Sequence, residues 1–395
     1  MSWRISSGFT FDYEVPEFGE YIYVVRVKSE CATESFDTGS VQYTVNVVDN
    51  SRYYWKVDVA EGDWGNPDNW DCDKTSSSGR KTVPNSPYCE ARFDNRGTGP
   101  TVVTLDGKYD IYQLKLANVA NVKLTLAGKG VPGTDHELHV TDGDYGLRFP
   151  EGADFTLSNA YVRSDGKMLP NRNSKTRVLY GSTLDLNTEF WWRSDDNSYD
   201  ADLEIRGRST LYLRNYSLRC QGGNGTVILD DSTIYCGEGT NPHGVQIEYV
   251  KTGTAGIQFI VMGEQPQFLV NYVRLDHTNC GGFTFVIPEG GFKAPVFSQY
   301  PRTQGSEFNP YMDDNACIPF AVSQDSPALK SKVKCKLIDW PGTVSPDMLD
   351  LSLPEKYETR ASFRWTYGEN DAATGEVPTG LWLDCKGGGT VVKIR

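Results

Sequence analysis

The feature that most restricts the fold of this chain is a ladder of short apolar pairs between residues 101 and 236. In stretches such as "VVTLDG", "VKLTLAG" and "DFTLSNA", two apolar residues stand two positions apart and a turn residue follows. The pairs are Val103/Leu105, Leu114/Leu116, Leu124/Leu126, Leu138/Val140, Leu147/Phe149, Phe155/Leu157, Leu184/Leu186, Leu203/Ile205, Leu211/Leu213, Val227/Leu229 and Ile234/Cys236. Most steps between pairs are seven to eleven residues, enough for one short strand and one tight turn. The ladder predicts an all-β protein.

Regular short strands are compatible with two architectures, a coiled solenoid and an antiparallel β-sandwich. The strands here are uniformly short, and most turns contain a single Gly, Asn or Asp rather than the Asn-Gly or Asp-Gly pairs of two-residue hairpins. The apolar face also continues from unit to unit, as neighbours stacked on a shared core require. We expect a parallel solenoid, with the antiparallel sandwich as the alternative.

The flanking segments divide the chain into four parts. Residues 1–50 contain alternating strands whose last members resemble the end of an immunoglobulin-like or fibronectin-like domain. Residues 51–100 form a junction rich in Trp, Cys and turn residues, and residues 101–255 carry the ladder. We interpret residues 256–395 as closing coils of the same β-structure, with loop insertions and a C-terminal cap.

Composition excludes several classes of protein. Aromatic residues make up 12% of the chain and 39 residues are Gly, which fits a turn-rich β-protein with a real core rather than a disordered chain. The net charge of −13 argues against a nucleic-acid partner, since phosphate binding requires clustered Lys and Arg. The longest apolar runs, such as 257–262, are far shorter than the ~20 residues of a membrane helix, so we expect no transmembrane segment.

Nine Cys, several of them in polar turns, indicate a cellular compartment. No CxxC motif or Cys/His pair has the spacing of a zinc site, and cytosolic proteins seldom carry so many Cys in such places. We therefore expect an oxidising, extracellular or cell-surface location. The N-terminal "MSWRISSGFTFDYEV" lacks the apolar region of a signal peptide, so we expect the export signal to lie upstream or to have been removed.

One stretch joins the junction to the ladder: "YYWKVDVAEGDWGNPDNWDC", followed by "TVVTLDG" and "YQLKLANVANVKLTLAG". This succession resembles bacterial parallel β-helix surface proteins related in style to autotransporter passenger domains. Trp55, Gly62, Trp64 and Trp70 match the Trp pattern that precedes the first coils in those proteins, and the resemblance extends over residues 53–395. It implies a right-handed, secreted or surface-bound β-helix from a scaffold class without shared catalytic residues.

The resemblance gives the three Trp of the junction a structural role. The first coil of a solenoid exposes an apolar cross-section that must be covered, and each buried aromatic contributes on the order of 1.5–3 kcal/mol. We expect Trp55, Trp64 and Trp70 to form this cap, with a ligand platform as the alternative. A disulfide between Cys72 and Cys89, which flank the second half of the junction, would contribute roughly 3 kcal/mol.

Acidic residues beside Trp mark a candidate ligand site in "WWRSDDNSYDAD", the longest break of the central ladder. Its candidate ligand-binding residues are Trp191, Trp192, Arg193, Asp195, Asp196 and Asp200. Carboxylates in this loop could hold calcium, serve a polysaccharide lyase or a glycoside hydrolase, or form solvated turns. Nothing in their spacing fixes two carboxylates at a defined separation, so we assign no catalytic residue. His136 and His139 do not suggest a metal site, because residues i and i+3 of a strand point to opposite faces.

Together these patterns predict a non-enzymatic extracellular or cell-surface module with an adhesion, display or structural role. The alternatives are a carbohydrate-active β-helix enzyme and a carbohydrate-binding module. Expected partners are glycans or other surface proteins, and calcium is the one cofactor that the sequence leaves open. The oligomeric state is open as well.

Overall fold

The structure is a computed structural model. It describes residues 19–25, 41–47, 49–73, 81–93, 99–116, 122–129, 136–169, 173–188, 190–193, 202–221, 225–236, 244–247, 257–275, 281–299, 317–340, 344, 346–367 and 378–387.

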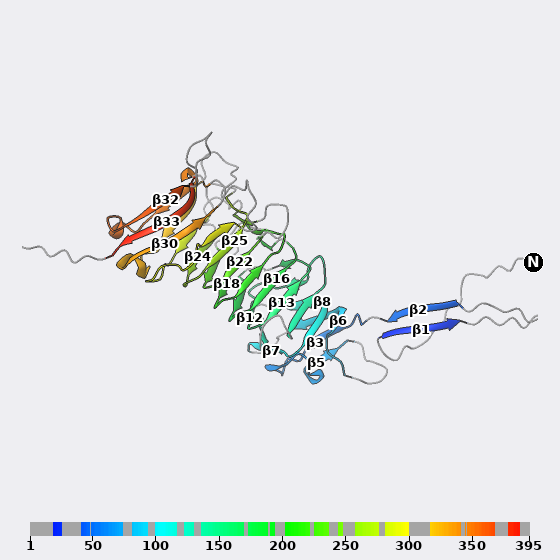
Figure 1. Ribbon diagram of the computed structural model, residues 1–395. Helices are drawn as coiled ribbons and strands as arrows, with labels where there is room; N and C mark the ends of the chain where they lie inside the picture. Colours follow the sequence, from blue (N-terminus) through cyan, green and yellow to red (C-terminus); the bar gives the residue numbers. More distant parts are fainter. Residues whose placement is uncertain are drawn as a thin grey trace, which may run out of the picture.

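The regular structure of the described residues is almost entirely β. Besides the two-stranded sheet of β1 (Gly19–Val25) and β2 (Val41–Val47) there are three sheets, whose strands follow one another along a common direction (Figure 1). Sheet 1 has sixteen strands: β3 (Arg52–Trp55), β5 (Trp70–Cys72), β6 (Ser86–Phe93), β8 (Lys108–Leu116), β10 (Glu137–Val140), β11 (Leu147–Arg148), β13 (Tyr161–Ser164), β14 (Met168–Leu169), β16 (Thr183–Leu186), β19 (Thr210–Tyr212), β22 (Thr233–Tyr235), β25 (Gln267–Val270), β28 (Phe297–Gln299), β30 (Lys332–Asp339), β32 (Ala361–Tyr367) and β33 (Pro378–Lys386). Sheet 2 has eleven strands: β4 (Glu61–Asp63), β7 (Thr101–Leu105), β9 (Lys123–Gly128), β12 (Asp154–Ser158), β15 (Lys175–Leu179), β18 (Asp202–Arg206), β21 (Thr226–Asp230), β24 (Gln258–Met262), β27 (Phe283–Phe285), β29 (Ile318–Val322) and β31 (Leu349–Ser352). Sheet 3 has four: β17 (Phe190–Arg193), β20 (Leu218–Gln221), β23 (Gly244–Ile247) and β26 (Tyr272–Leu275).

The strands of these sheets pair in parallel with partners that lie far away in sequence. From β15 to β26 the chain visits sheet 2, sheet 1 and sheet 3 in turn, and each strand pairs with the third strand after it. In this register Leu203 of β18 lies beside Val227 of β21, so apolar residues align from one turn of the chain to the next. Consecutive strands within this region do not form hairpins, and the antiparallel sandwich is therefore not the architecture of these sheets.

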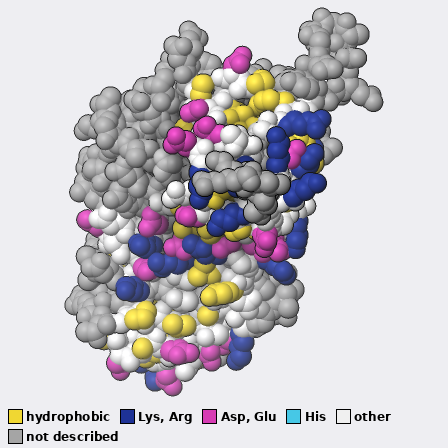
Figure 2. Space-filling view, turned by 90° about the vertical axis from the view of Figure 1, so that its left-hand side faces the viewer, with side chains coloured by type: hydrophobic (Ala, Val, Ile, Leu, Met, Phe, Trp, Pro, Cys, Tyr) yellow, Lys and Arg dark blue, Asp and Glu magenta, His cyan; other side chains and the backbone are white. Residues whose placement is uncertain are grey.

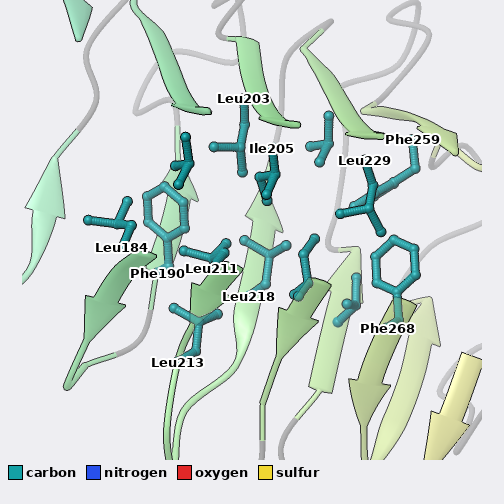
Figure 3. Close-up of a cluster of buried hydrophobic side chains, with 14 of the residues drawn as sticks. Leu184, Phe190, Leu203, Ile205, Leu211, Leu213, Leu218, Leu229, Phe259 and Phe268 are labelled. Atoms are coloured by element: carbon teal, nitrogen blue, oxygen red, sulfur yellow. The ribbon is translucent and has the colours of Figure 1, made fainter. Parts of the chain in front are cut away.

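The apolar pairs of the ladder point into one shared core. Every residue of the predicted pairs between 101 and 236 is buried. Figure 3 shows how the core is shared: Leu184 comes from sheet 1, Phe190 from sheet 3 and Leu203 from sheet 2, and their side chains turn toward one another. Further along, phenylalanines stack on their partners in the next turn, with ring centroids 4.7 Å apart for Phe268 and Phe297.

The corners between sheet 2 and sheet 1 repeat a common geometry. Asn159, Asp231 and Gly263 follow β12, β21 and β24, and all three have positive φ. Asn and Asp tolerate this left-handed conformation better than other side chains do, which explains why single turn residues punctuate the ladder. A buried Ser follows the Asp231 corner, and the Ser232 hydroxyl accepts a hydrogen bond from the backbone N–H of Ser209 at 3.1 Å.

Antiparallel pairing is found at both ends. In the N-terminal segment β1 (Gly19–Val25) pairs with β2 (Val41–Val47), and β3 pairs with β5. At the C-terminal end β30 is still parallel to β28, but β33 is antiparallel to β30 and β32 is antiparallel to β33. Among the described residues, β32 and β33 therefore do not continue the parallel coils.

Helical structure in the described residues is limited to single 3-10 turns, η1 (Pro67–Asn69), η2 (Pro327–Lys330), η3 (Pro346–Met348) and η4 (Glu355–Tyr357). None of these is long or apolar enough to cross a membrane.

Candidate functional surface

The predicted glycan site falls mostly outside the described residues. β17 places the backbone of Trp191 and Trp192 in sheet 3, where they pair with Arg219 and Cys220 of β20. The three predicted carboxylate residues, Asp195, Asp196 and Asp200, lie outside the described residues. The side chains of Trp191, Trp192 and Arg193 are not described either. Convergence of these groups on one cavity therefore stays a prediction.

The three Trp of the junction are buried together at the β3–β5 end of the stack. Exposed fractions are 2% for Trp55, 0% for Trp64 and 5% for Trp70. Trp70 packs edge-on against both of the others, with ring centroids 5.0 Å apart in each case, and against Phe93 at 5.5 Å. Because the rings face the core and one another, these Trp cannot stack on a ligand.

Each indole of this cluster also has a hydrogen-bond acceptor. Trp64 Nε1 donates to the carbonyl of Pro84 at 2.9 Å, and Trp70 Nε1 donates to the carbonyl of Trp64 at 2.9 Å. Trp55 Nε1 donates to the carbonyl of Val59 at 2.7 Å. The cluster thus fastens the loops of the junction to the end of the sheets without leaving a buried donor unpaired.

The predicted disulfide between Cys72 and Cys89 is wrong, because both residues are free thiols. Cys72 lies on β5 and pairs with Tyr53 of β3, whereas Cys89 lies on β6, which pairs with the other edge of β3. One strand therefore separates the two Cys. Two strand spacings amount to about 9.5 Å, beyond the ~7 Å limit between the Cα atoms of a disulfide.

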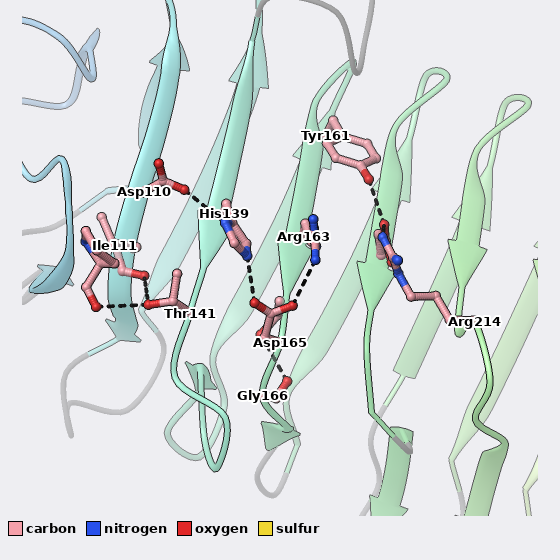
Figure 4. A network of polar contacts seen from close by, with 12 residues as sticks. Asp110, Ile111, His139, Thr141, Tyr161, Arg163, Asp165, Gly166 and Arg214 are labelled. Carbon is pink, nitrogen blue, oxygen red and sulfur yellow. Dashed lines mark hydrogen bonds and ion pairs between the residues drawn. The ribbon is translucent and has the colours of Figure 1, made fainter.

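A network of polar side chains runs across the outer face of sheet 1 (Figure 4). His139 on β10 contacts Asp110 of β8 through Nδ1 at 2.9 Å and Asp165 through Nε2 at 2.8 Å. Arg163 of β13 donates to the same Asp165 at 3.3 Å. Burial alone would raise the pKa of Asp165, but the hydrogen bond and charge of His139, together with Arg163, lower it below the usual value. Both ring nitrogens of His139 are engaged, and the imidazole links β8 and β10 to the residue that follows β13.

A fully buried carboxylate continues this network. Asp185 of β16 is 0% exposed, although it stands on the outer face, because neighbouring side chains cover it. Tyr161 donates its hydroxyl to Asp185 at 2.6 Å, and Arg214 donates Nε at 2.7 Å and Nη2 at 2.6 Å. With its oxygens saturated and no access to solvent, this carboxylate ties the strands together and is not available as a base or as a ligand for a sugar.

Three exposed tyrosines stand near this network at the edge between sheet 1 and the segment that follows β10. They are Tyr88 on β6, Tyr112 on β8 and Tyr145 before β11. Thr141 Oγ1 donates to the carbonyl of Pro87 at 3.0 Å, and Gln113 donates to the carbonyl of Tyr145 at 2.7 Å. These contacts hold the segments that carry the three rings beside one another. We call Tyr88, Tyr112 and Tyr145 the tyrosine patch.

Charged groups surround the tyrosine patch. The Arg148 guanidinium lies 5.1 Å from the ring centroid of Tyr145, and the Lys167 ammonium lies 5.9 Å from it. Repulsion by the Asp142 carboxylate raises the pKa of Tyr112. Exposed aromatic rings with nearby polar groups are typical of contact surfaces. The sequence does not reveal this patch, because the three Tyr lie far apart in the chain. They are brought together only by the pairing of β6 with β8 and by the contact of Gln113 with Tyr145.

No protein family model, no curated protein and no solved structure matches this chain. Among the described residues, no group of three or more His, Cys, Asp and Glu side chains is placed to hold a metal ion.

Proposed function

We propose that this chain is a right-handed parallel β-helix that acts as a non-enzymatic, extracellular or cell-surface module for adhesion or display. The observation that carries the proposal is the parallel pairing of each strand with the third strand after it, repeated between β15 and β26. Such a stack buries a continuous core and presents long, regular outer faces. A scaffold of this kind suits a protein that must hold binding surfaces away from an attachment point.

Ion pairs between neighbouring coils support a rigid scaffold. On the outer face of sheet 2, Arg177 pairs with Asp154 of the preceding coil and lies 3.5 Å from Glu204 of the next one. Arg206 continues the series with Asp230 at 3.0 Å. Such half-buried surface pairs contribute only about 0–1 kcal/mol each, but together they favour this register over a slipped one.

Both ends of the stacked strands are covered, which supports a scaffold that does not polymerise through its exposed core. The buried cluster of Trp55, Trp64 and Trp70 covers one end, and the antiparallel strands β33 and β32 extend the other. A closed solenoid needs such caps to stay soluble.

The proposed location rests on the family resemblance of residues 53–395. The cysteines do not support it, because the six Cys whose side chains the structure describes are free thiols. Four of them, Cys89, Cys236, Cys335 and Cys385, are buried and serve as small apolar side chains of the core.

A binding and turnover assay on the purified chain tests the proposed function. We expect it to adhere to at least one immobilised glycan or cell-surface preparation. We also expect it to release neither reducing ends nor unsaturated uronates from a panel of neutral and uronic-acid polysaccharides. Release of either product would contradict the non-enzymatic role and favour the carbohydrate-active enzyme instead.

The tyrosine patch favours a second candidate function, that of a carbohydrate-binding module for neutral sugars. Its three rings are exposed, and the polar groups around Tyr112 and Tyr145 could orient hydroxyls. Replacing Tyr88, Tyr112 and Tyr145 by Ala should then abolish binding on a glycan array. Unchanged array binding by the triple variant would remove this candidate.

A further inference from the structure

The C-terminal end of sheet 1 carries a second surface, formed by β30, β33 and β32. Alternate residues of these antiparallel strands point away from the core, while Cys335, Leu383 and Ala361 between them are buried. The outward residues form three rows: Lys332, Lys386 and Arg360; Lys334, Asp384 and Ser362; Lys336, Trp382 and Arg364. We call these nine residues the basic face.

The basic face is opposite in charge to the rest of the protein. Six of its nine residues are Lys or Arg and one is Asp, whereas the whole chain has a net charge of −13. Figure 2 views the molecule from the end at which β30, β32 and β33 lie, and Lys and Arg side chains gather there at the upper right. Local clustering of cations on an acidic protein is not explained by solubility.

The first row is unfavourable for folding. Lys332 and Lys386 stand directly opposite each other, and the backbone N–H of Lys386 donates to the carbonyl of Arg360 at 2.8 Å, which places a third cation in the same row. Like charges on directly opposed residues destabilise a sheet. Within the described part of the chain these three side chains form no ion pair, and all three are exposed. A row that costs stability indicates a function that compensates for it.

The third row adds an aromatic ring between cations. Trp382 stands between Lys336, whose Nζ lies 5.6 Å from the ring centroid, and Arg364 on the neighbouring strand. Its indole Nε1 is buried and has no hydrogen-bond partner in the described structure. The row thus presents a partly exposed aromatic ring beside two positive charges, of which Lys336 is also paired with Asp339.

We propose that the basic face binds an acidic polysaccharide, a chain of sugars that carries carboxylate or sulfate groups. Neighbouring residues across the strands are about 4.8 Å apart and successive rows about 6.7 Å apart, so the cations can meet charges on successive sugar units. Cations bind carboxylates and sulfates through charge-assisted hydrogen bonds, and the Trp382 ring can pack on a sugar. This inference names a partner for the adhesive role proposed above and rests on that role for the choice of an extracellular polymer.

Nucleic acid fits this surface less well. Double-stranded DNA carries one charge per about 1.7 Å of axis and is bound by strongly basic domains. The isoelectric point of this chain is about 4.9, so most of its surface would repel so dense a polyanion.

The test compares the full chain with two triple variants. Lys332→Gln, Arg360→Gln and Lys386→Gln remove the first row, and Lys108→Gln, Lys129→Gln and Arg208→Gln remove three exposed cations elsewhere while lowering the net charge equally. Binding to polygalacturonate, dextran sulfate, neutral dextran and a single-stranded DNA oligonucleotide is measured by surface plasmon resonance at two salt concentrations. Polygalacturonate and dextran sulfate separate carboxylate from sulfate recognition.

We expect the wild type to bind at least one of the two acidic polysaccharides and not dextran. The first-row variant should raise the Kd by about tenfold or more and weaken the salt dependence, whereas the second variant should bind like the wild type. Loss of binding to an equal extent in both variants, or tighter binding to DNA, would overturn the proposal. So would a concentration-dependent dimer that only the first-row variant abolishes, since the face would then be a contact between copies. Absence of all polyanion binding overturns this inference alone, because adhesion to other glycans is measured separately.

Discussion

Arg214, which follows β19, forms a bidentate ion pair with Asp185 on β16. Its Nε and Nη2 lie 2.7 Å and 2.6 Å from the two carboxylate oxygens. The arginine adopts a left-handed backbone conformation, with φ of 47°, which is unusual for a residue other than glycine. Its partner is fully buried. A strained backbone and a desolvated charge are thus held in place by one bidentate ion pair between adjacent coils.

Removing this arginine should destabilise the protein strongly. In Arg214→Ala the Asp185 carboxylate stays buried without its cation, and we expect the free energy of unfolding to fall by about 3 kcal/mol. Urea denaturation followed by circular dichroism measures the change. Tyr161→Phe, which removes a single hydrogen bond to the same carboxylate, is the matched control and should cost less, about 1.5 kcal/mol. Equal effects, or a loss below about 0.5 kcal/mol in Arg214→Ala, would show that the pair does not hold the coils.

The contacts of Asp165 predict a specific dependence of stability on pH. Its pKa in the folded protein lies below the ordinary value of 3.8, so its contribution is fully present above pH 3.8 and is lost as the pH falls through the lowered value. We expect the stability difference between the wild type and Asp165→Asn to be largest near neutral pH and to shrink below pH 3.8. Asp110→Asn removes the other carboxylate partner of His139. The Asp110 side chain is 59% exposed, so this substitution should change stability less. A difference that grows on acidification would contradict the assignment.

The Trp cluster predicts a large and local loss of stability. Trp64→Ala should lower the free energy of unfolding by about 3–5 kcal/mol, because it opens a cavity and leaves the Pro84 carbonyl without its donor. Val57→Ala, at a side chain in the same junction that is 63% exposed, should change stability by less than about 0.5 kcal/mol. Thermal unfolding of the wild type, Trp64→Ala and Val57→Ala checks this order of stabilities. A Trp64→Ala variant as stable as the Val57→Ala variant would mean that the junction is not packed on the sheets.

The cysteines predict a pattern of chemical reactivity. Burial raises the pKa of Cys89 and Cys236 to about 12, so neither forms a thiolate near neutral pH. Alkylation of the native protein by iodoacetamide, followed by peptide mapping, should modify the exposed Cys317 and leave Cys89 and Cys236 unmodified until the chain is unfolded. A Cys72–Cys89 bridge in the non-reduced peptides would contradict the strand order β5–β3–β6.

The sequence could predict the strands and their inward residues because that information is local. Leu203 and Ile205 are separated by one outward residue, and any strand with this pattern buries both. The turn residues were equally informative, since Asp231 at a corner has positive φ. Parallel stacking followed from the continuity of such pairs and from the lack of hairpin turns.

Relations between coils could not be predicted, because they depend on the register of strands far apart in the chain. Asp185 and Arg214 become partners only when β16 lies beside β19, and the spacing of coils along the sequence is irregular. The same limit produced the wrong disulfide, since nothing between Cys72 and Cys89 reveals that β3 inserts between their strands. The reversal at β33 was also missed, because an edge strand has the same alternation in either direction.

The central claim is that successive turns of the chain add one parallel strand at a time to sheet 2. Electron spin-echo distance measurements test it most directly, with one nitroxide at Thr125 and a second at Ile260, Thr284 or Ala321, attached through p-acetylphenylalanine so that native Cys stay untouched. These positions belong to one lateral row, separated from Thr125 by five, six and seven strand steps. At about 4.8 Å per step we expect separations near 24, 29 and 34 Å, rising with each added coil. Separations that stay level or shrink from Ile260 to Ala321 would contradict the parallel stack.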